Sequence, residues 1–270
     1  MFKYLWIPIL IVFAATAAHA EEPDPISVGT DALKDRRFTV AAANFKSAYT
    51  NGDPEGLFYI GRMQELGLGT QANLAKAVIV YQNAQKEGSL RAANRLGLLH
   101  LDGKGVLQDF EAARNLICAA ADSGLANAQF NCGVLMAQGR GGDQNLEGAV
   151  GFYAKAASQA HLGAMNLYGL ALLRGNGTEA DPAAARSWLE KTAAQGNSLG
   201  LFTLGEIYEN GLGIEADLRQ AHVYYNLAGA RGHPQAIQAR QRTERGMSET
   251  DIEAAQTEAR NWSPTPADEN

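Results

Sequence analysis

The chain has 270 residues, of which 46% are hydrophobic and 19% are charged, and its formal net charge is −6. This composition excludes a largely disordered chain, and the acidic balance argues against nucleic-acid binding, which needs an excess of Lys and Arg. The chain contains 29 Gly but only 8 Pro, and it is also rich in alanine. Because alanine is the best helix former and glycine nearly the worst, a helical protein that uses both must place its glycines at special positions.

Residues 1–20 have the features of a secretory signal peptide. Lys3 is their only charged residue, an apolar run follows it, and Ala18-His19-Ala20 has the A-x-A form of a cleavage site. The apolar run, at about 15 residues, is shorter than the roughly 18–20 that a membrane-spanning helix needs. We therefore expect cleavage after Ala20, no membrane span in the mature protein, and a periplasmic or secreted location.

Residues 21–55 form the first predicted unit of the mature chain. Ala32, Phe38, Ala41 and Phe45 are spaced as apolar residues are on a pair of helices. The unit is an imperfect copy of the one that follows it, which is how the terminal unit of a repeat array is expected to differ.

Residues 56–235 contain a repeat with a period of 36 residues. Its strongest mark is a Gly-x-Gly pair, and an isolated glycine and an alanine recur at the same step. The pairs are Gly67/Gly69, Gly103/Gly105, Gly139/Gly141, Gly175/Gly177 and Gly211/Gly213. A fixed period of this length is the sequence signature of a solenoid.

Each unit is predicted to be a helix–turn–helix. The Gly-x-Gly pair ends the first helix, because glycine readily adopts the left-handed conformation found there. An interior glycine such as Gly97 is costly in a helix and predicts close approach of another helix. Each second helix is expected to begin at an Asn or Asp that caps its free N–H groups. These residues are Asn73, Asp109, Asn145, Asp181 and Asp217.

The repeat resembles Sel1-like repeats, which are related to the tetratricopeptide repeat. The resemblance rests on Lys76-Ala77, Tyr81, Ala120-Ala121, Lys155-Ala156-Ala157 and Ala193-Ala194-Gln195-Gly196, together with the glycine pairs. It implies an all-α, right-handed α-solenoid of five Sel1-like repeats over residues 56–235, and it makes residues 21–55 a degenerate, tetratricopeptide-like repeat.

Residues 236–262 are expected to cap the solenoid with helices. Gly246 interrupts the helical pattern, and Ser248 with Asp251 three residues later is a variant of the capping box that begins a last helix. Residues 263–270 are predicted to be a disordered tail.

The sequence contains one weak match to a catalytic motif. Gly196-Asn197-Ser198-Leu199-Gly200 has the G-x-S-x-G form, but that motif needs a strand-to-helix elbow, whereas these residues lie in the turn between two helical units. The four His of the mature chain form no metal-binding pattern. We therefore expect no catalytic residues, no metal, no cofactor and no enzymatic activity.

Cys118 and Cys132 leave two alternatives open. An even number of cysteines in an oxidising compartment favours a disulfide. However, the residues equivalent to Cys118 in other units are mostly solvent-facing types, whereas those equivalent to Cys132 are apolar. Some secreted Sel1-like proteins join comparable helix pairs through cysteines eight residues apart, whereas here the spacing is fourteen. The other possibility is a buried thiol at Cys132 and an exposed one at Cys118.

Residues of the first helices are candidates for binding a partner on the concave face. They are Phe58, Asn94, Phe130, Asn166 and Phe202 in one column, with Arg62 and Glu206 from the column four residues on. They either line a groove for a peptide or helix, with the aromatic rings as anchors, or pack between neighbouring first helices. Arg62 and Glu206 are expected to be exposed in both cases.

The resemblance implies a periplasmic protein–protein interaction scaffold or adaptor. Its partner would be an envelope protein, for example the extracytoplasmic domain of a sensor kinase that it regulates. Two alternatives remain: a penicillin-binding or β-lactamase-like secreted Sel1 protein, and a host-interaction virulence factor. The missing S-x-x-K motif and the cysteine spacing weigh against the β-lactamase-like alternative.

Overall fold

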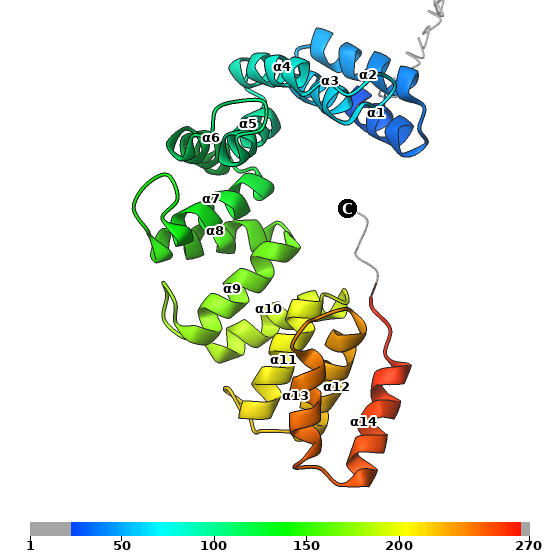
Figure 1. Cartoon of the computed structure of the whole chain (residues 1–270), viewed down its shortest axis with the longest axis vertical. Coiled ribbons are helices and arrows are strands. Elements are labelled where there is room, and N and C mark those ends of the chain that lie inside the picture. The colour runs from blue at the N-terminus through cyan, green and yellow to red at the C-terminus, as the bar shows by residue number, and fades with distance from the viewer. Residues whose placement is uncertain (1–22, 266–270) are drawn as a thin grey trace, which may run out of the picture.

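The computed structural model describes residues 23–265, and these contain fourteen helices and no strand. The helices stack one after another into a long curved array (Figure 1). The predicted signal peptide lies outside the described residues.

Each repeated unit is a pair of helices, as the glycine pattern predicts. The first helices of units 1 to 5 are α3 (Glu55–Leu66), α5 (Leu90–Asp102), α7 (Ala126–Gln138), α9 (Leu162–Arg174) and α11 (Ser198–Asn210). The second helices are α4 (Leu74–Lys86), α6 (Phe110–Asp122), α8 (Leu146–Ser158), α10 (Pro182–Ala194) and α12 (Leu218–Ala230). Before them come α1 (Pro25–Lys34) and α2 (Phe38–Thr50), and after them α13 (Ala236–Glu244) and α14 (Glu249–Asn261).

The helix ends confirm the predicted capping. In unit 2, Gly103 ends α5 in the left-handed conformation at φ 66°, and its N–H donates to the carbonyl of Leu99. Asp109 then begins α6, where its side chain accepts a 2.9 Å hydrogen bond from the N–H of Ala112. The same cap at Asn73, Asn145, Asp181 and Asp217 begins the other second helices.

The interior glycines allow the two helices of a unit to touch. A side chain on Gly97 would collide with Ile117 of α6, and a side chain on Gly205 would collide with Tyr225 of α12. The same contact joins Gly29 to Phe45, so α1 and α2 pack as the later units do. The large residue of each pair is buried in the core. These contacts confirm the close helix approach that the glycine column predicts.

One turn between units departs from glycine. The residue after each second helix that turns the chain is Gly52, Gly88, Gly124, Gly196 or Gly232, but unit 3 has Ala160 there. Ala160 keeps the left-handed conformation of its equivalents, at φ 61°. That conformation is unfavourable for a residue with a Cβ atom. The repeat geometry is therefore imposed on Ala160 by the packing on either side.

A disulfide joins Cys118 of α6 to Cys132 of α7, with 5.0 Å between their Cα atoms. Cys132 is fully buried and Cys118 is half-buried. The residues equivalent to Cys118 in other units are mostly polar, which suggested that this position faces solvent. In the structure, Cys118 lies on the side of α6 that α7 covers. The bond connects unit 2 to unit 3.

The C-terminal end is capped by two helices, of which α13 is shortened to 9 residues. Helix α14 packs against α12 and begins at Ser248, whose Oγ accepts a 3.1 Å hydrogen bond from the N–H of Asp251. Of the predicted tail, the structure describes residues 263–265. The N–H of Thr265 donates a 2.7 Å hydrogen bond to the carbonyl of Ala194, the last residue of α10.

Candidate functional site

The aromatic members of the predicted binding column pack against other rings. Phe130 stacks on His161 with 4.6 Å between ring centroids, and Phe202 stacks on His233 at 4.0 Å. Phe58 contacts Tyr81 at 5.9 Å. Phe202 is only 8% exposed. These contacts are the ones expected of the packing alternative, and they give two histidines of one turn column a structural partner.

The asparagines of the same column are buried and hydrogen-bonded. Asn166 is 4% exposed, donates to the side-chain oxygen of Asn197 at 3.0 Å, and accepts from Thr192 at 2.8 Å. Asn94 accepts a 3.0 Å hydrogen bond from Asn131 of the next first helix. Buried polar groups need such partners, so these asparagines hold units together.

Arg62 and Glu206 are less exposed than the sequence suggests. Both are half-buried, because neighbouring first helices lie close together. Helix α3, for example, contacts α5 directly. Arg62 forms a 2.8 Å ion pair with Glu65. Burial raises the pKa of Glu206, although the charge of Arg174 opposes that shift.

A charged cluster at the N-terminal end links α3, α4 and α5. Glu65 accepts a 2.6 Å hydrogen bond from the hydroxyl of Tyr81 and forms ion pairs with Arg62 and Arg95. Burial by itself would raise the pKa of Glu65, but the bonds from Arg95 and Tyr81 lower it below its ordinary value. We call these four residues the N-terminal cluster.

A second cluster, built in the same way, lies four units later. Glu209 occupies the position in unit 5 that Glu65 occupies in unit 1. It accepts a 2.6 Å hydrogen bond from Tyr225 and two from Arg242 of α13, at 2.7 and 2.6 Å. The bonds from Arg242 are the main reason that the pKa of Glu209 is lowered. Glu209, Tyr225 and Arg242 are the C-terminal cluster.

Between the two clusters the same columns are apolar. Where the end units carry Arg or Glu, units 2 to 4 carry half-buried aliphatic residues, which we call the central apolar strip. Its members are Leu98, Leu101, Val134, Ala137, Leu170 and Leu173. One of these columns is predicted from the sequence, but the equivalence of Glu65 and Glu209 is not. The signal that could have found it is the change from charged to apolar and back along a single column.

The strip opens into a small cleft of about 200 Å³ between units 3 and 4. Ala137 and Leu170 of the strip line it, together with Leu167 and with Val150 and Tyr153 of α8. Burial raises the pKa of Tyr153 to about 12, so its hydroxyl is neutral at physiological pH. The cleft suits an apolar side chain, because most of its walls are aliphatic and aromatic, although Arg174 and Asn176 also line it.

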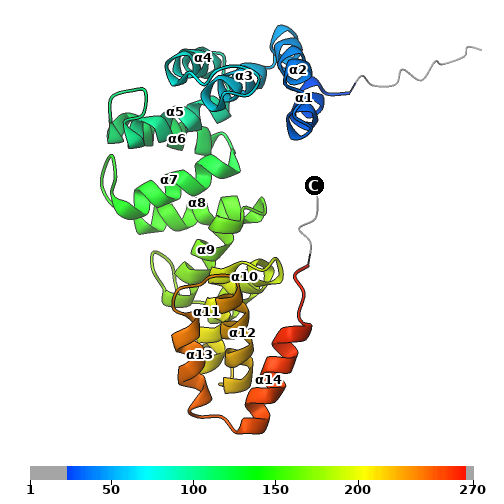
Figure 2. The same ribbon diagram turned by 45° about the vertical axis from the view of Figure 1, so that its right-hand side comes forward.

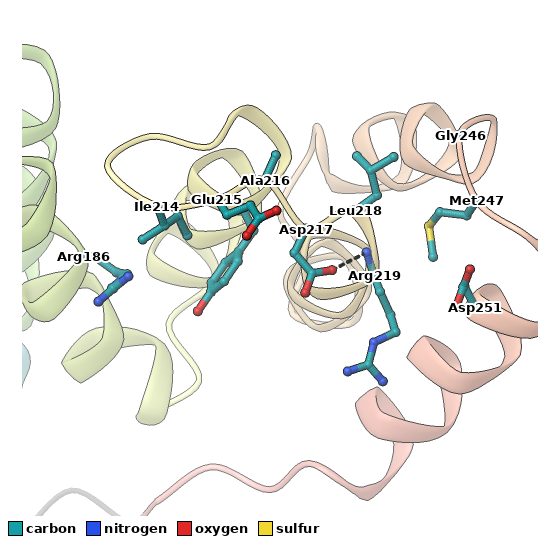
Figure 3. A pocket seen from close by; sticks show the side chains of 11 residues that line it. Arg186, Ile214, Glu215, Ala216, Asp217, Leu218, Arg219, Gly246, Met247 and Asp251 are labelled. Carbon is teal, nitrogen blue, oxygen red and sulfur yellow. Dashed lines mark hydrogen bonds between the residues drawn. The ribbon is translucent and has the colours of Figure 1, made fainter.

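A larger pocket of about 620 Å³ lies at the C-terminal end, between unit 5 and α14 (Figure 3). Four of its five charged side chains have partners within the protein, and the fifth, Glu215, is exposed to solvent. Asp217 caps α12, Asp251 accepts from Ser248, Arg186 pairs with Glu190 at 3.3 Å, and Arg219 pairs with Glu258 at 3.5 Å. Because these groups are already occupied, we interpret the pocket as a seam between the last unit and its cap.

Two features are absent from residues 23–265. No group of three or more His, Cys, Asp or Glu in this range is arranged to hold a metal ion. No helix in this range is long and apolar enough to cross a membrane.

The stacked helix pairs define an α-solenoid repeat protein. A family model for the Sel1 repeat matches residues 54–84, 90–125, 126–161, 163–197 and 198–233, and the chain belongs to this family. Sel1 repeat proteins generally mediate protein–protein interactions, and their fold is typically a non-enzymatic scaffold.

Among the solved structures that resemble the chain, the first described below has the same fold. A Sel1 repeat protein from Oxalobacter formigenes is 24% identical over 86% of this chain and 97% of its own, with a TM-score of 0.72. The protective antigen c5321 of uropathogenic Escherichia coli is 22% identical over 87% of this chain and 67% of its own, with a TM-score of 0.41. The immunity protein Pa5087 of Pseudomonas aeruginosa is 17% identical over 76% of this chain and 83% of its own, with a TM-score of 0.43. No curated protein matches the chain.

Proposed function

We propose that the protein is a periplasmic scaffold that binds a protein partner along the central apolar strip. The observation that carries this proposal is the strip itself: aliphatic side chains at equivalent positions of three successive first helices are partly exposed, between two charged clusters. A contiguous apolar patch on a soluble protein with a polar border is typical of an interaction site. The partner segment that fits it is an amphipathic helix, which presents apolar residues at regular steps.

The strip is held in a fixed shape before any partner binds. Each first helix is locked by its glycine contact with the second helix, and the charged clusters fasten the first and last pairs of first helices to each other. Little ordering is then needed on association, so more of the gain from burying apolar surface is retained as affinity. That gain is about 25 cal/mol for each Å² of apolar surface removed from water.

The location and the class of partner rest on separate observations. The features of residues 1–20 support export, and disulfides such as Cys118–Cys132 persist mainly in oxidising compartments. We therefore place the partner among envelope proteins, with the extracytoplasmic domain of a sensor kinase as one example.

The test is crosslinking in cells with variants of the strip. Val134→Glu and Leu170→Glu each place a charge within the apolar surface and should reduce partner capture at least tenfold. Ile79→Glu is the matched control, because Ile79 is 58% exposed on the second helix α4, away from the strip. Circular dichroism verifies that all three variants are folded. Undiminished capture by both strip variants would refute the proposal.

A further inference from the structure

The end of the described chain follows an edge of the solenoid. After α14, residues 262–265 continue upward from the end of that helix, toward the earlier units of the array (Figures 1 and 2). The guanidinium of Arg231 lies 4.4 Å from the ring centroid of Trp262. The N–H of Thr265 reaches the carbonyl of Ala194 at 2.7 Å. The segment is thus held at both ends.

The carbonyl of Ala194 is available because it belongs to the last residue of α10. An α-helix leaves its final carbonyls without partners inside the helix, and another group must satisfy them. Pro264 has no N–H to offer, so Thr265 is the residue that can donate from this position. Gly196 borders the same spot, and a Cβ on it would lie 2.9 Å from Nε of Arg231 and 3.6 Å from Cβ of Pro264. The turn is therefore covered by the tail and by Arg231.

The arginine distinguishes this turn from the others. The residues equivalent to Arg231 in the preceding units are Glu87, Ser123, Gln159 and Gln195, none of which carries a positive charge. A cation above an aromatic ring attracts it electrostatically, most strongly when the ring is tryptophan. The earlier turns therefore lack the group that holds Trp262.

We propose that the ends of α10 and α12, with Arg231, form a binding site for an extended segment in which an aromatic residue is followed by proline, and that the chain's own C-terminal segment occupies this site in cis. Three features recognise such a segment. The guanidinium of Arg231 attracts the aromatic ring, and the turn at Gly196 leaves room for the proline. The carbonyl of Ala194 accepts a hydrogen bond from the N–H of the residue after the proline. Proline-containing segments are already extended, so they lose little conformational freedom on binding. The site does not involve the central apolar strip, so its test is independent of the test of the proposed function.

The experiment uses the full-length chain and a fluorescein-labelled peptide with the sequence of residues 261–270. Thr265→Pro removes the N–H that holds the tail, whereas the matched variant Thr265→Ala keeps it. With the tail released, the peptide should bind the Thr265→Pro protein at least fivefold more tightly than the Thr265→Ala protein in a fluorescence anisotropy titration. Equal binding to the two proteins would overturn the proposal.

A second pair of variants tests the arginine. In the Thr265→Pro protein, Arg231→Ala should weaken peptide binding at least tenfold. Arg140→Ala removes another arginine that lies over a ring, that of Phe110 at 4.5 Å, and should leave binding unchanged. Peptide binding that survives Arg231→Ala would contradict the assigned site. A wild-type dimer that Thr265→Pro dissociates would show that the tail sits in a second copy, which overturns occupancy in cis.

Discussion

The hydroxyl of Tyr225 donates a 2.6 Å hydrogen bond to the carboxylate of Glu209, and so ties α12 to α11. Tyr225 is fully buried, and Glu209 reaches it from the first-helix face. The bond therefore connects the core of unit 5 to its charged cluster.

Tyr225→Phe tests the contribution of this bond to stability. The ring still fills the space above Gly205, but Glu209 loses one of its donors. We expect the free energy of unfolding to fall by about 1.5–3 kcal/mol, as for hydrogen bonds to charged groups. Urea unfolding measures it. Tyr49→Phe, at a tyrosine that is 40% exposed, is the control and should change little. Equal effects of the two substitutions would show that the bond contributes nothing.

The left-handed Ala160 makes a stabilising substitution predictable. Ala160→Gly removes the steric cost of a Cβ at φ 61° and should raise the free energy of unfolding by about 1 kcal/mol. Gly124→Ala is the reverse change at the equivalent turn, where no atom lies within 4 Å of an added Cβ. It should destabilise the protein by a similar amount through backbone strain alone. Thermal unfolding measures the stability change of both variants. Changes of the same sign would contradict the explanation from left-handed backbone strain.

Glu209 makes stability depend on pH. Its pKa is lower in the folded protein than in the unfolded chain, so the unfolded state binds protons first as the pH falls. The stabilisation is complete above the ordinary pKa of about 4.5 and is lost as the pH falls toward the folded value. Glu209→Gln should therefore flatten the loss of stability between neutral and acidic pH, as measured by urea unfolding at several pH values. Glu215→Gln, at an exposed glutamate of the same unit, should leave that loss unchanged.

Removing the disulfide should be costly. The double variant Cys118→Ser/Cys132→Ser releases a loop whose ends are fourteen residues apart. The chain-entropy estimate for a loop of this size is about 3 kcal/mol. Chemical denaturation of the variant, compared with the oxidised wild-type protein, measures the loss. The reduced wild-type protein should be as stable as the variant, and a variant as stable as the oxidised protein would contradict the estimate.

The sequence predicted the features that recur and missed those that occur once or twice. The period of 36 residues placed Gly97 against a large residue and Asp109 at a helix start, because every unit repeats the same contacts. Phe202 remained ambiguous, since an aromatic column has the same spacing whether it packs or binds. The pairing of Glu65 with Arg95 depends on side chains that the other units do not share. The contact of Thr265 with Ala194 joins segments far apart in the chain, and no repeat pattern could indicate it.

The covalent bond between units 2 and 3 also determines how the array comes apart. In a repeat protein each unit contacts mainly its neighbours, so opening can start at either end and pass inward one unit at a time. The cysteines connect α6 to α7 near the middle of this path. Opening from the two ends therefore converges on a fragment that cannot separate. Limited proteolysis of the oxidised protein should leave a resistant piece around residues 90–161, and reduction should make it digestible.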